Sequence, residues 1–154
     1  MITLKRIYSD NMNLPLVISD SIGYPSDEKV KQVLQSYTAK DMYLIGSFLN
    51  EKLIGVIGFQ ILEYCITIRH LSVLKDHRRS GIGTLLVQYL IQNFKSRIEV
   101  ETNSSAIEFY SKLGFSYKKI YRKYGDEYIV RYSCERLIYM KSKRLQELKS
   151  KISI

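Results

Sequence analysis

The chain has 154 residues and a formal net charge of +9, and its residues are 45% hydrophobic and 25% charged. This length suits one domain, and the composition is too apolar for an intrinsically disordered protein. The densest apolar stretch, Leu53 to Leu62, is far shorter than the ~20 residues that cross a bilayer, and no signal-peptide core precedes Asp10. We therefore expect one domain over residues 1–154, located in the cytoplasm, with no membrane contact.

The chain contains only two cysteines and two histidines. Cys65 and Cys134 lack CxxC spacing, which argues against a structural zinc site. We therefore expect no metal and two reduced thiols. The excess of 24 Lys and Arg over 15 Asp and Glu predicts a surface that attracts anions. Charge alone does not choose among phosphates, nucleic acids and acidic lipids.

Hydrophobic periodicity and turn residues predict a continuous series of strands and helices. In chain order they are a strand Ile2 to Tyr8, two short helices separated near Gly23 and Pro25, strands Met42 to Leu49, Lys52 to Leu62 and Cys65 to Leu74, a helix Gly81 to Phe94, a strand Ile98 to Val100, a helix Ser104 to Leu113, strands Phe115 to Tyr121 and Tyr128 to Met140, and an amphipathic helical tail over residues 141–154. The strand–helix–strand unit around the helix Gly81 to Phe94 makes its two strands parallel neighbours. The predicted class is mixed α/β, with a mostly antiparallel central sheet and helices on both faces.

The segment from Leu71 to Leu86 carries the clearest chemical signal. A strand ends, a basic turn follows, and Gly81 and Gly83 open a helix whose first amides have no partners inside the helix. Missing side chains let phosphate oxygens approach those amides, and the helix dipole favours negative charge there. The pattern therefore predicts a diphosphate site. The competing interpretation is that Gly81 only starts the helix and Gly83 only allows close packing on the sheet.

Two common phosphate loops do not match this segment. The P-loop requires a lysine directly after its second glycine, and neither glycine here is followed by lysine. The dinucleotide pattern GxGxxG requires a third glycine where Leu86 stands. The sequence therefore supports neither nucleotide fold.

Two sequence blocks instead resemble the GNAT superfamily of acyl-CoA N-acyltransferases. Arg78-x-x-Gly81-x-Gly83 is similar to the family's pyrophosphate loop, which reads Arg or Gln, two residues, Gly, one residue, then Gly or Ala. The segment from Asn103 to Phe115 is similar to the family's Asn-x-x-Ala-x-x-x-Tyr-x-x-x-Gly-Phe block. The order of elements matches as well. The resemblance covers roughly residues 42–140, whereas residues 1–40 fit only in the order of their elements.

This resemblance implies an N-acetyltransferase that uses acetyl-CoA as a co-substrate. It also implies that the two parallel strands splay apart and that pantetheine lies between them. The main-chain amides of the splayed strand lack hydrogen-bond partners there and can bond to pantetheine. The residues that it assigns to acetyl-CoA are Leu71, Ser72, Val73, Arg78, Arg79, Ser80, Gly81, Ile82, Gly83, Thr84 and Asn103. The backbone groups of Leu71 and Val73 are the ones expected to face pantetheine.

Tyr110 matches the family tyrosine that protonates the departing CoA thiolate. A phenol with a pKa of about 10 is a suitable acid for a thiolate with a pKa of about 8.5. The implied reaction is direct attack of a neutral primary amine on the thioester, because neither cysteine is placed beside a base that would activate it.

The general base is harder to assign, because positions 67 and 69, where some members carry Glu or His, hold Thr67 and Arg69. Glu99 and Glu101 share one face of the next strand, and we prefer Glu101, acting directly or through water, since it lies nearer the end of that strand. His70, whose imidazole could titrate near neutrality, should point away from its neighbours at 69 and 71.

Two other functions stay open at this point. One is a non-catalytic acyl-CoA sensor on the same fold. The other is a basic nucleic-acid-binding module with tyrosines as stacking platforms, which we disfavour because the tyrosines are spread over predicted core and loops. We expect a small-molecule or peptide amine as the partner and no specific nucleic acid. The amine's identity and the formation of a homodimer stay open.

Overall fold

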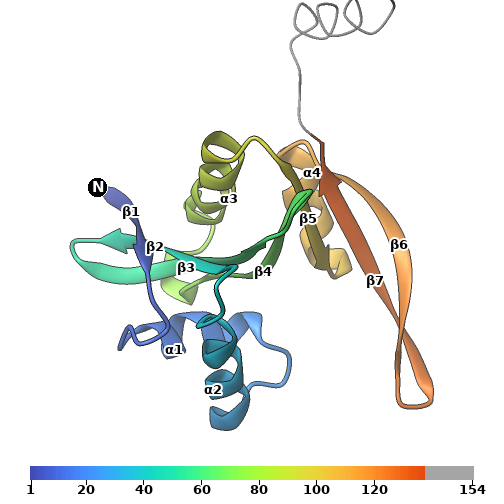
Figure 1. Cartoon of the computed structure of the whole chain (residues 1–154), viewed down its shortest axis with the longest axis horizontal. Helices are drawn as coiled ribbons and strands as arrows, with labels where there is room; N and C mark the ends of the chain where they lie inside the picture. Colours follow the sequence, from blue (N-terminus) through green and yellow to red (C-terminus); the bar gives the residue numbers. More distant parts are fainter. Residues whose placement is uncertain (138–154) are drawn as a thin grey trace, which may run out of the picture.

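The computed structural model describes residues 1–137, and they form a seven-stranded sheet in the order β1-β2-β3-β4-β5-β7-β6 (Figure 1). β4 and β5 are parallel, and the other neighbouring pairs are antiparallel. The strands are β1 (Ile2–Ile7), β2 (Met42–Leu49), β3 (Lys52–Ile61), β4 (Cys65–Val73), β5 (Arg97–Thr102), β6 (Ser116–Tyr124) and β7 (Glu127–Arg136). The predicted mixed α/β class and the predicted parallel pair are confirmed.

Helices cover both faces of this sheet. The α-helices are α1 (Leu14–Ile18), α2 (Asp27–Ser36), α3 (Ile82–Asn93) and α4 (Ile107–Lys112), and the 3-10 helices are η1 (Ser19–Ser21), η2 (Lys75–His77) and η3 (Ser104–Ala106). Figure 1 shows α1 and α2 on one side of the sheet and α3 and α4 on the other. The residues of β3 from Leu53 to Phe59 are all buried, because this strand is covered on both faces.

Local sequence signals explain where several elements begin and end. Ser26 caps α2, because its Oγ accepts a hydrogen bond from the Lys29 amide at 3.2 Å. Gly114 follows α4 with φ at +90°, the left-handed conformation with which a helix commonly ends. A two-residue turn joins β6 to β7, and its first residue, Gly125, has φ at +61°, where a type II′ turn needs glycine.

Some element boundaries differ from the prediction. β6 continues to Tyr124 rather than Tyr121, because its last residues pair with β7 right up to the turn although their side chains are exposed. The predicted helix Ser104 to Leu113 is a 3-10 turn followed by the shorter α4. β7 ends at Arg136, and the predicted continuation to Met140 and the helical tail over residues 141–154 lie outside the described residues.

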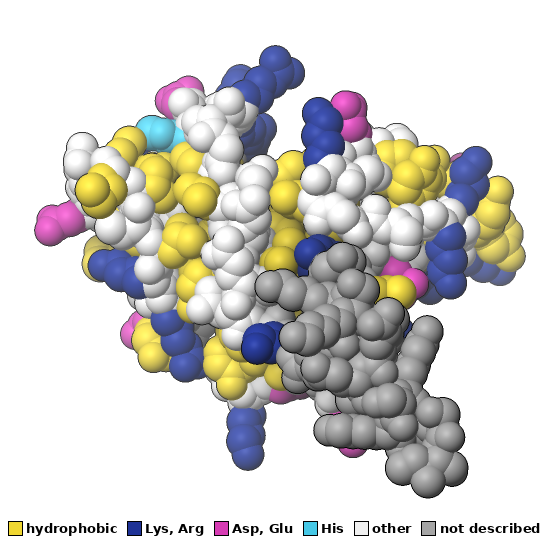
Figure 2. Space-filling model, turned by 90° about the horizontal axis from the view of Figure 1, so that it is seen from above, with side chains coloured by type: hydrophobic (Ala, Val, Ile, Leu, Met, Phe, Trp, Pro, Cys, Tyr) yellow, Lys and Arg dark blue, Asp and Glu magenta, His cyan; other side chains and the backbone are white. Residues whose placement is uncertain are grey.

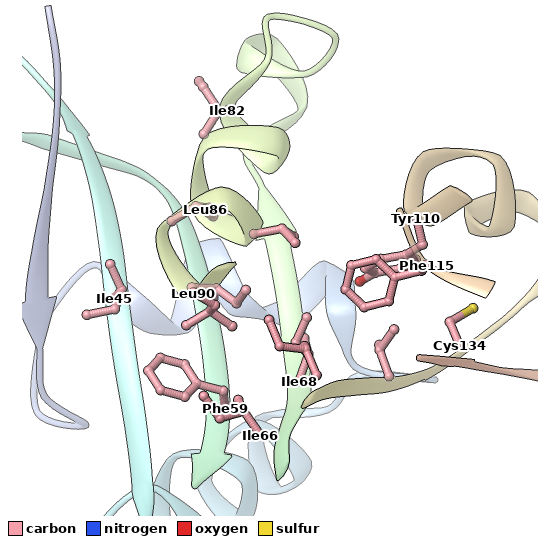
Figure 3. Close-up of a cluster of buried hydrophobic side chains, with 14 of the residues drawn as sticks. Ile45, Phe59, Ile66, Ile68, Ile82, Leu86, Leu90, Tyr110, Phe115 and Cys134 are labelled. Atoms are coloured by element: carbon pink, nitrogen blue, oxygen red, sulfur yellow. The ribbon is translucent and has the colours of Figure 1, made fainter. Parts of the chain in front are cut away.

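The larger hydrophobic core lies between the sheet and α3. Leu86, Val87 and Leu90 of α3 are fully buried against β-strand side chains such as Phe59 (Figure 3). The same cluster reaches Tyr110 on α4. Fully burying aliphatic side chains of this size stabilises a fold by about 1.5–3 kcal/mol each, so α3 is firmly attached to the sheet.

No helix within residues 1–137 combines the length and the apolarity needed to span a membrane. These residues also contain no group of three or more His, Cys, Asp or Glu side chains placed to hold a metal ion. Cys65 and Cys134 are both free and buried.

Candidate functional site

The parallel strands β4 and β5 separate partway along their length. Their pairing runs from Cys65 opposite Arg97 to Ile68 opposite Val100 and stops there. At the same point the register between β3 and β4 shifts, which leaves Arg69 as the extra residue of a β-bulge. Because a bulge bends the strand that carries it, β4 departs from β5 and stays paired with β3 alone. The splayed pair that the resemblance implied is present.

The splayed half of β4 presents main-chain groups to the gap. The amide of Leu74 donates to the carbonyl of Ile54 on β3 at 2.8 Å. Since successive residues of a strand direct their N–H and C=O groups to opposite sides, the groups of Leu71 and Val73 face away from β3. They therefore lie along the open side of the splay.

Ser72 does not face the splay, unlike Leu71 and Val73, with which it was assigned to acetyl-CoA. Its backbone pairs with Val56 on β3, and its buried Oγ donates to the carbonyl of Val17 on α1 at 2.6 Å. Ser72 thus ties β4 to α1, and neither its side chain nor its backbone faces the splay.

The N-terminus of α3 lies just beyond the end of β4. Its first turn begins after Gly81, whose φ is +84°, and the first helical hydrogen bond runs from the Leu85 amide to the Gly81 carbonyl at 3.0 Å. The amides of residues 82–84 therefore have no partner within the helix. A Cβ built on Gly81 would have no atom within 4 Å, so the space beside the first residue before the helix is open.

Gly83 bears on the choice between packing and ligand binding. A Cβ built at this residue would lie 3.5 and 3.6 Å from two ring atoms of Phe109 on α4, which are ordinary van der Waals distances. Packing within the protein therefore does not require glycine at this position. The same contact shows that the start of α3 lies against Phe109 of α4, whose ring in turn packs against that of Tyr110.

The two arginines of the loop differ in their surroundings. Arg78 donates from Nε to the Val73 carbonyl at 2.9 Å and from Nη2 to Asp20 at 2.8 Å, so it joins the loop to β4 and η1. Arg79 is exposed, with φ at +61°. Ser80 donates from Oγ to the His77 carbonyl. Arg79 is consequently the arginine of this loop that is available to an anion.

Tyr110 extends from α4 toward β4 (Figure 3). Its side chain is 4% exposed and packs edge-to-face against Phe109 and Phe115, with ring centroids 4.9 and 5.3 Å away. Burial, with a smaller contribution from Cys134, raises the pKa of Tyr110 above the ordinary value. The phenol therefore keeps its proton well beyond physiological pH, as a proton donor must.

Glu101, near the end of β5, is held by two arginines of the β6–β7 hairpin. Its Oε1 accepts from Nε and Nη2 of Arg122 at 2.8 and 2.7 Å, and its Oε2 lies 3.5 Å from Nε of Arg131. Glu99 instead forms an ion pair with Arg97 at 2.8 Å. The sequence interpretation missed Arg122 and Arg131, because only the hairpin register places them beside β5.

Asn103 immediately follows β5 and starts η3. Its Oδ1 accepts from the Ser105 amide at 3.1 Å and from Ser105 Oγ at 2.5 Å. The carbonyl oxygen of this side chain therefore holds the turn before α4. Its amide nitrogen, a hydrogen-bond donor, is the group that remains for a ligand.

A Tyr37–His70 pair on the α1 and α2 side of the sheet was also missed. The Tyr37 hydroxyl lies 2.6 Å from Nδ1 of His70, and a Cβ on Gly58 would lie only 1.9 Å from that hydroxyl. A glycine within a central strand was the available signal for this close approach. Burial, with a smaller contribution from Arg69, lowers the pKa of His70 to about 4. His70 therefore does not titrate near neutrality, although an unperturbed imidazole would.

We expect the free energy of unfolding to decrease as the pH falls from about 6.5 toward 4. An unfolded histidine binds its proton near pH 6.5, whereas folded His70 binds it only at about 4. The unfolded state therefore holds more protons in this window, and acid favours it. Urea unfolding of the wild type and His70→Asn across the window measures the effect. The variant should show a shallower dependence, and equal slopes would contradict the assignment.

Comparisons with known proteins agree with this arrangement. The model of the Acetyltransferase (GNAT) family matches residues 8–115. The UPF0157 protein YqkA of Bacillus subtilis is 31% identical over 111 residues, which cover 68% of this chain and 32% of YqkA. The N-alpha-acetyltransferase 30 of Schizosaccharomyces pombe is 38% identical over 88 residues, covering 49% of this chain and 59% of that protein. The chain thus spans about a third of the first relative and three-fifths of the second.

Among solved structures, the ribosomal-protein-S18-alanine N-acetyltransferase of Escherichia coli is similar with a TM-score of 0.72 and 20% identity, over 93% of this chain and 97% of that one. Structures that are 16–18% identical to this chain hold coenzyme A or acetyl-CoA. At such identities the likeness shows the fold alone. The family model, however, matches more than half of the sequence, and the chain therefore belongs to the GNAT family of acetyltransferases.

Proposed function

We propose that this chain is an acetyl-CoA-dependent N-acetyltransferase that acetylates a primary amine by direct attack. The observation that supports it most is the meeting of three features at one place. The splay between β4 and β5, the unpaired amides of α3 and the buried, protonated Tyr110 lie next to one another, and Phe109 connects the last two.

The residues at this place fit acetyl-CoA. The open space at Gly81, the amides of residues 82–84 and the cation of Arg79 suit a diphosphate. Both main-chain groups of Leu71 and the amide of Val73 suit the amides of pantetheine, because they lack strand partners on that side, whereas the Val73 carbonyl already accepts from Nε of Arg78. Acetyl-CoA would supply an acetyl group activated as a thioester.

In the proposed mechanism, the amine nitrogen bonds to the thioester carbonyl carbon and the carbon–sulfur bond then breaks. Tyr110 donates its proton to the departing sulfur. Glu101 accepts the proton that the amine loses, directly or through water, while Arg122 and Arg131 hold the carboxylate in place. Burial raises the pKa of the Cys134 thiol, which opposes a thiolate nucleophile and supports transfer without a covalent enzyme intermediate.

A panel of amines tests this proposal. Release of the CoA thiol would be followed with peptides bearing free N-termini, lysine, polyamines, aminoglycosides and free amino acids. The names of the S. pombe relative and the E. coli structure make a protein N-terminus the first acceptor to try. Tight acetyl-CoA binding without turnover on any amine would favour an acyl-CoA sensor. Absence of acetyl-CoA binding in calorimetry would overturn both functions.

We expect Gly83→Ala to leave the affinity for acetyl-CoA within about threefold, because the family's loop pattern admits alanine at this position and the new Cβ faces Phe109 at van der Waals distance; substitutions that break no contact usually change free energies by less than ~0.5 kcal/mol. The melting temperature should stay equal or rise, since alanine favours a helix over glycine by up to ~1 kcal/mol. Calorimetry and thermal unfolding measure the two effects separately.

Gly81→Ala serves as the comparison for that experiment. Its φ of +84° strains any other residue, so this variant should lower the melting temperature. A strong loss of acetyl-CoA binding by Gly83→Ala without loss of stability would contradict this expectation, because it would mean that the diphosphate must approach the backbone of residue 83 more closely than a methyl group allows.

A further inference from the structure

The β6–β7 hairpin carries an unusual concentration of tyrosines on one face. Pairing places Tyr117 opposite Cys134, Lys119 opposite Tyr132, Tyr121 opposite Val130 and Lys123 opposite Tyr128. Alternation along each strand puts all of these side chains on the same side of the ribbon. We call this side, made of Tyr117, Lys119, Tyr121, Lys123, Tyr128, Val130 and Tyr132, the tyrosine face.

The tyrosine face is exposed beyond the point where α4 covers the hairpin. Tyr117, Tyr121 and Tyr128 are 53%, 63% and 67% exposed, and Val130 is 43% exposed. Figure 1 shows β6 and β7 extending past the helices, and Figure 2 shows hydrophobic side chains mixed with Lys and Arg at that end of the molecule. Exposed apolar patches of this kind mark interaction sites more often than chance.

The charge of the tyrosine face points to an anionic partner. Lys119 and Lys123 are both exposed, and none of the residues of the face is acidic. The acidic side chains of the strands in this region, Glu99, Glu101, Glu127 and Glu135, lie on the other side of the sheet, where Arg122 and Arg131 pair with Glu101, and Asp126 lies in the turn. Two copies of a face bearing only cations repel each other, which disfavours a second copy of this chain as the occupant.

Aromatic rings and cations that alternate along one ribbon suit a polymer with both flat rings and phosphates. Side chains two apart on a strand are about 7 Å apart, so consecutive lysines and tyrosines lie within the span of neighbouring nucleotides. Unpaired bases stack on tyrosine regardless of their identity, and lysines neutralise the phosphates. We propose that the tyrosine face binds single-stranded nucleic acid with little sequence preference.

The sequence alone disfavoured nucleic-acid binding, because the tyrosines are spread over the predicted core and loops. The hairpin register, however, gathers four of them on one surface. An acidic peptide would pair with the two lysines but would leave the rings without stacking partners. The inference does not depend on acetyl transfer, since no residue of the face belongs to the proposed acetyl-CoA site.

Fluorescence anisotropy of a labelled oligothymidine of about 15 nucleotides, a length near the upper site size of single-strand binders, tests the proposal with the full chain. Tyr121→Ala and Tyr128→Ala should each weaken binding about 5- to 100-fold, the range expected for one stacked base. Lys119→Glu should weaken binding and reduce the salt dependence by about 0.7 in log–log slope, the value for one lost phosphate contact.

Lys118→Glu is the matched control, because this neighbouring exposed lysine carries the same charge on the opposite face of β6. It should change affinity much less than Lys119→Glu. Equal effects of the two lysine variants, unchanged binding by both tyrosine variants, or binding of blunt duplex or polyglutamate as tight as that of the single strand would each overturn the proposal. Thermal unfolding of every variant separates these effects from loss of the fold.

Discussion

Replacing Tyr110 with phenylalanine should lower kcat by about 10²- to 10⁴-fold, the usual contribution of a positioned general acid. The phenylalanine ring keeps the edge-to-face packing with Phe109 and Phe115, so the melting temperature and the affinity for acetyl-CoA should change little. Steady-state kinetics with the best amine of the panel, together with calorimetry, measure both expectations.

Tyr43→Phe is a matched control, because Tyr43 packs against the same core cluster through a stacked contact with Phe59. It should leave kcat within about twofold, since it removes a hydroxyl that the proposed mechanism does not use. Because burial raises the pKa of Tyr110, the wild type should also keep its proton donor at pH values of about 10, where an exposed tyrosine is half ionised. A normal kcat for Tyr110→Phe would remove the proposed acid from the mechanism.

Replacing Glu101 with glutamine should lower kcat by about 10²-fold near neutral pH, the lower end of the range for a general base. The deficit should shrink as the pH rises, because hydroxide and other solvent bases then accept the proton that the attacking amine loses and partly replace Glu101. A loss of this kind distinguishes proton transfer from a structural role, since losing an exposed ion pair costs only about 0–1 kcal/mol of stability and does so without this pH dependence.

Glu99→Gln provides the comparison on the same strand and face. Glu99 forms its own ion pair with Arg97, so both variants remove one paired carboxylate from β5. If Glu99→Gln lost more activity than Glu101→Gln, the base would have to be reassigned to Glu99. Rate profiles against pH for the two variants and the wild type make the decision.

The parts of the site that follow from neighbouring residues could be predicted from sequence. The strand, basic turn and helix from Leu71 to Leu86 form a local unit. Its glycines indicate where the backbone adopts a conformation that other residues disfavour. The pairing of β4 with β5 followed from the helix between them, since a crossover connection of this kind implies parallel neighbours. The end of α4 was likewise marked by Gly114.

The parts that depend on register could not be predicted. The bulge at Arg69 shifts the pairing of the later residues of β4 with β3 by one position, and no residue type in the sequence predicts it. Three other features could not be predicted, because each joins residues far apart in the chain. They are the contact of His70 with Tyr37, the arginines around Glu101 and the grouping of the hairpin tyrosines. Burial then set the pKa of His70, which composition alone does not reveal.

The short run of pairing between β4 and β5 has a mechanical consequence. Within residues 1–137, the backbone pairing that joins the first four strands to the last three is confined to the residues from Cys65 to Ile68 on β4. Acetyl-CoA bound in this gap as proposed, with hydrogen bonds to the main chain of β4, would replace the missing part of a strand. On that proposal we expect binding of acetyl-CoA to stiffen the sheet about this line.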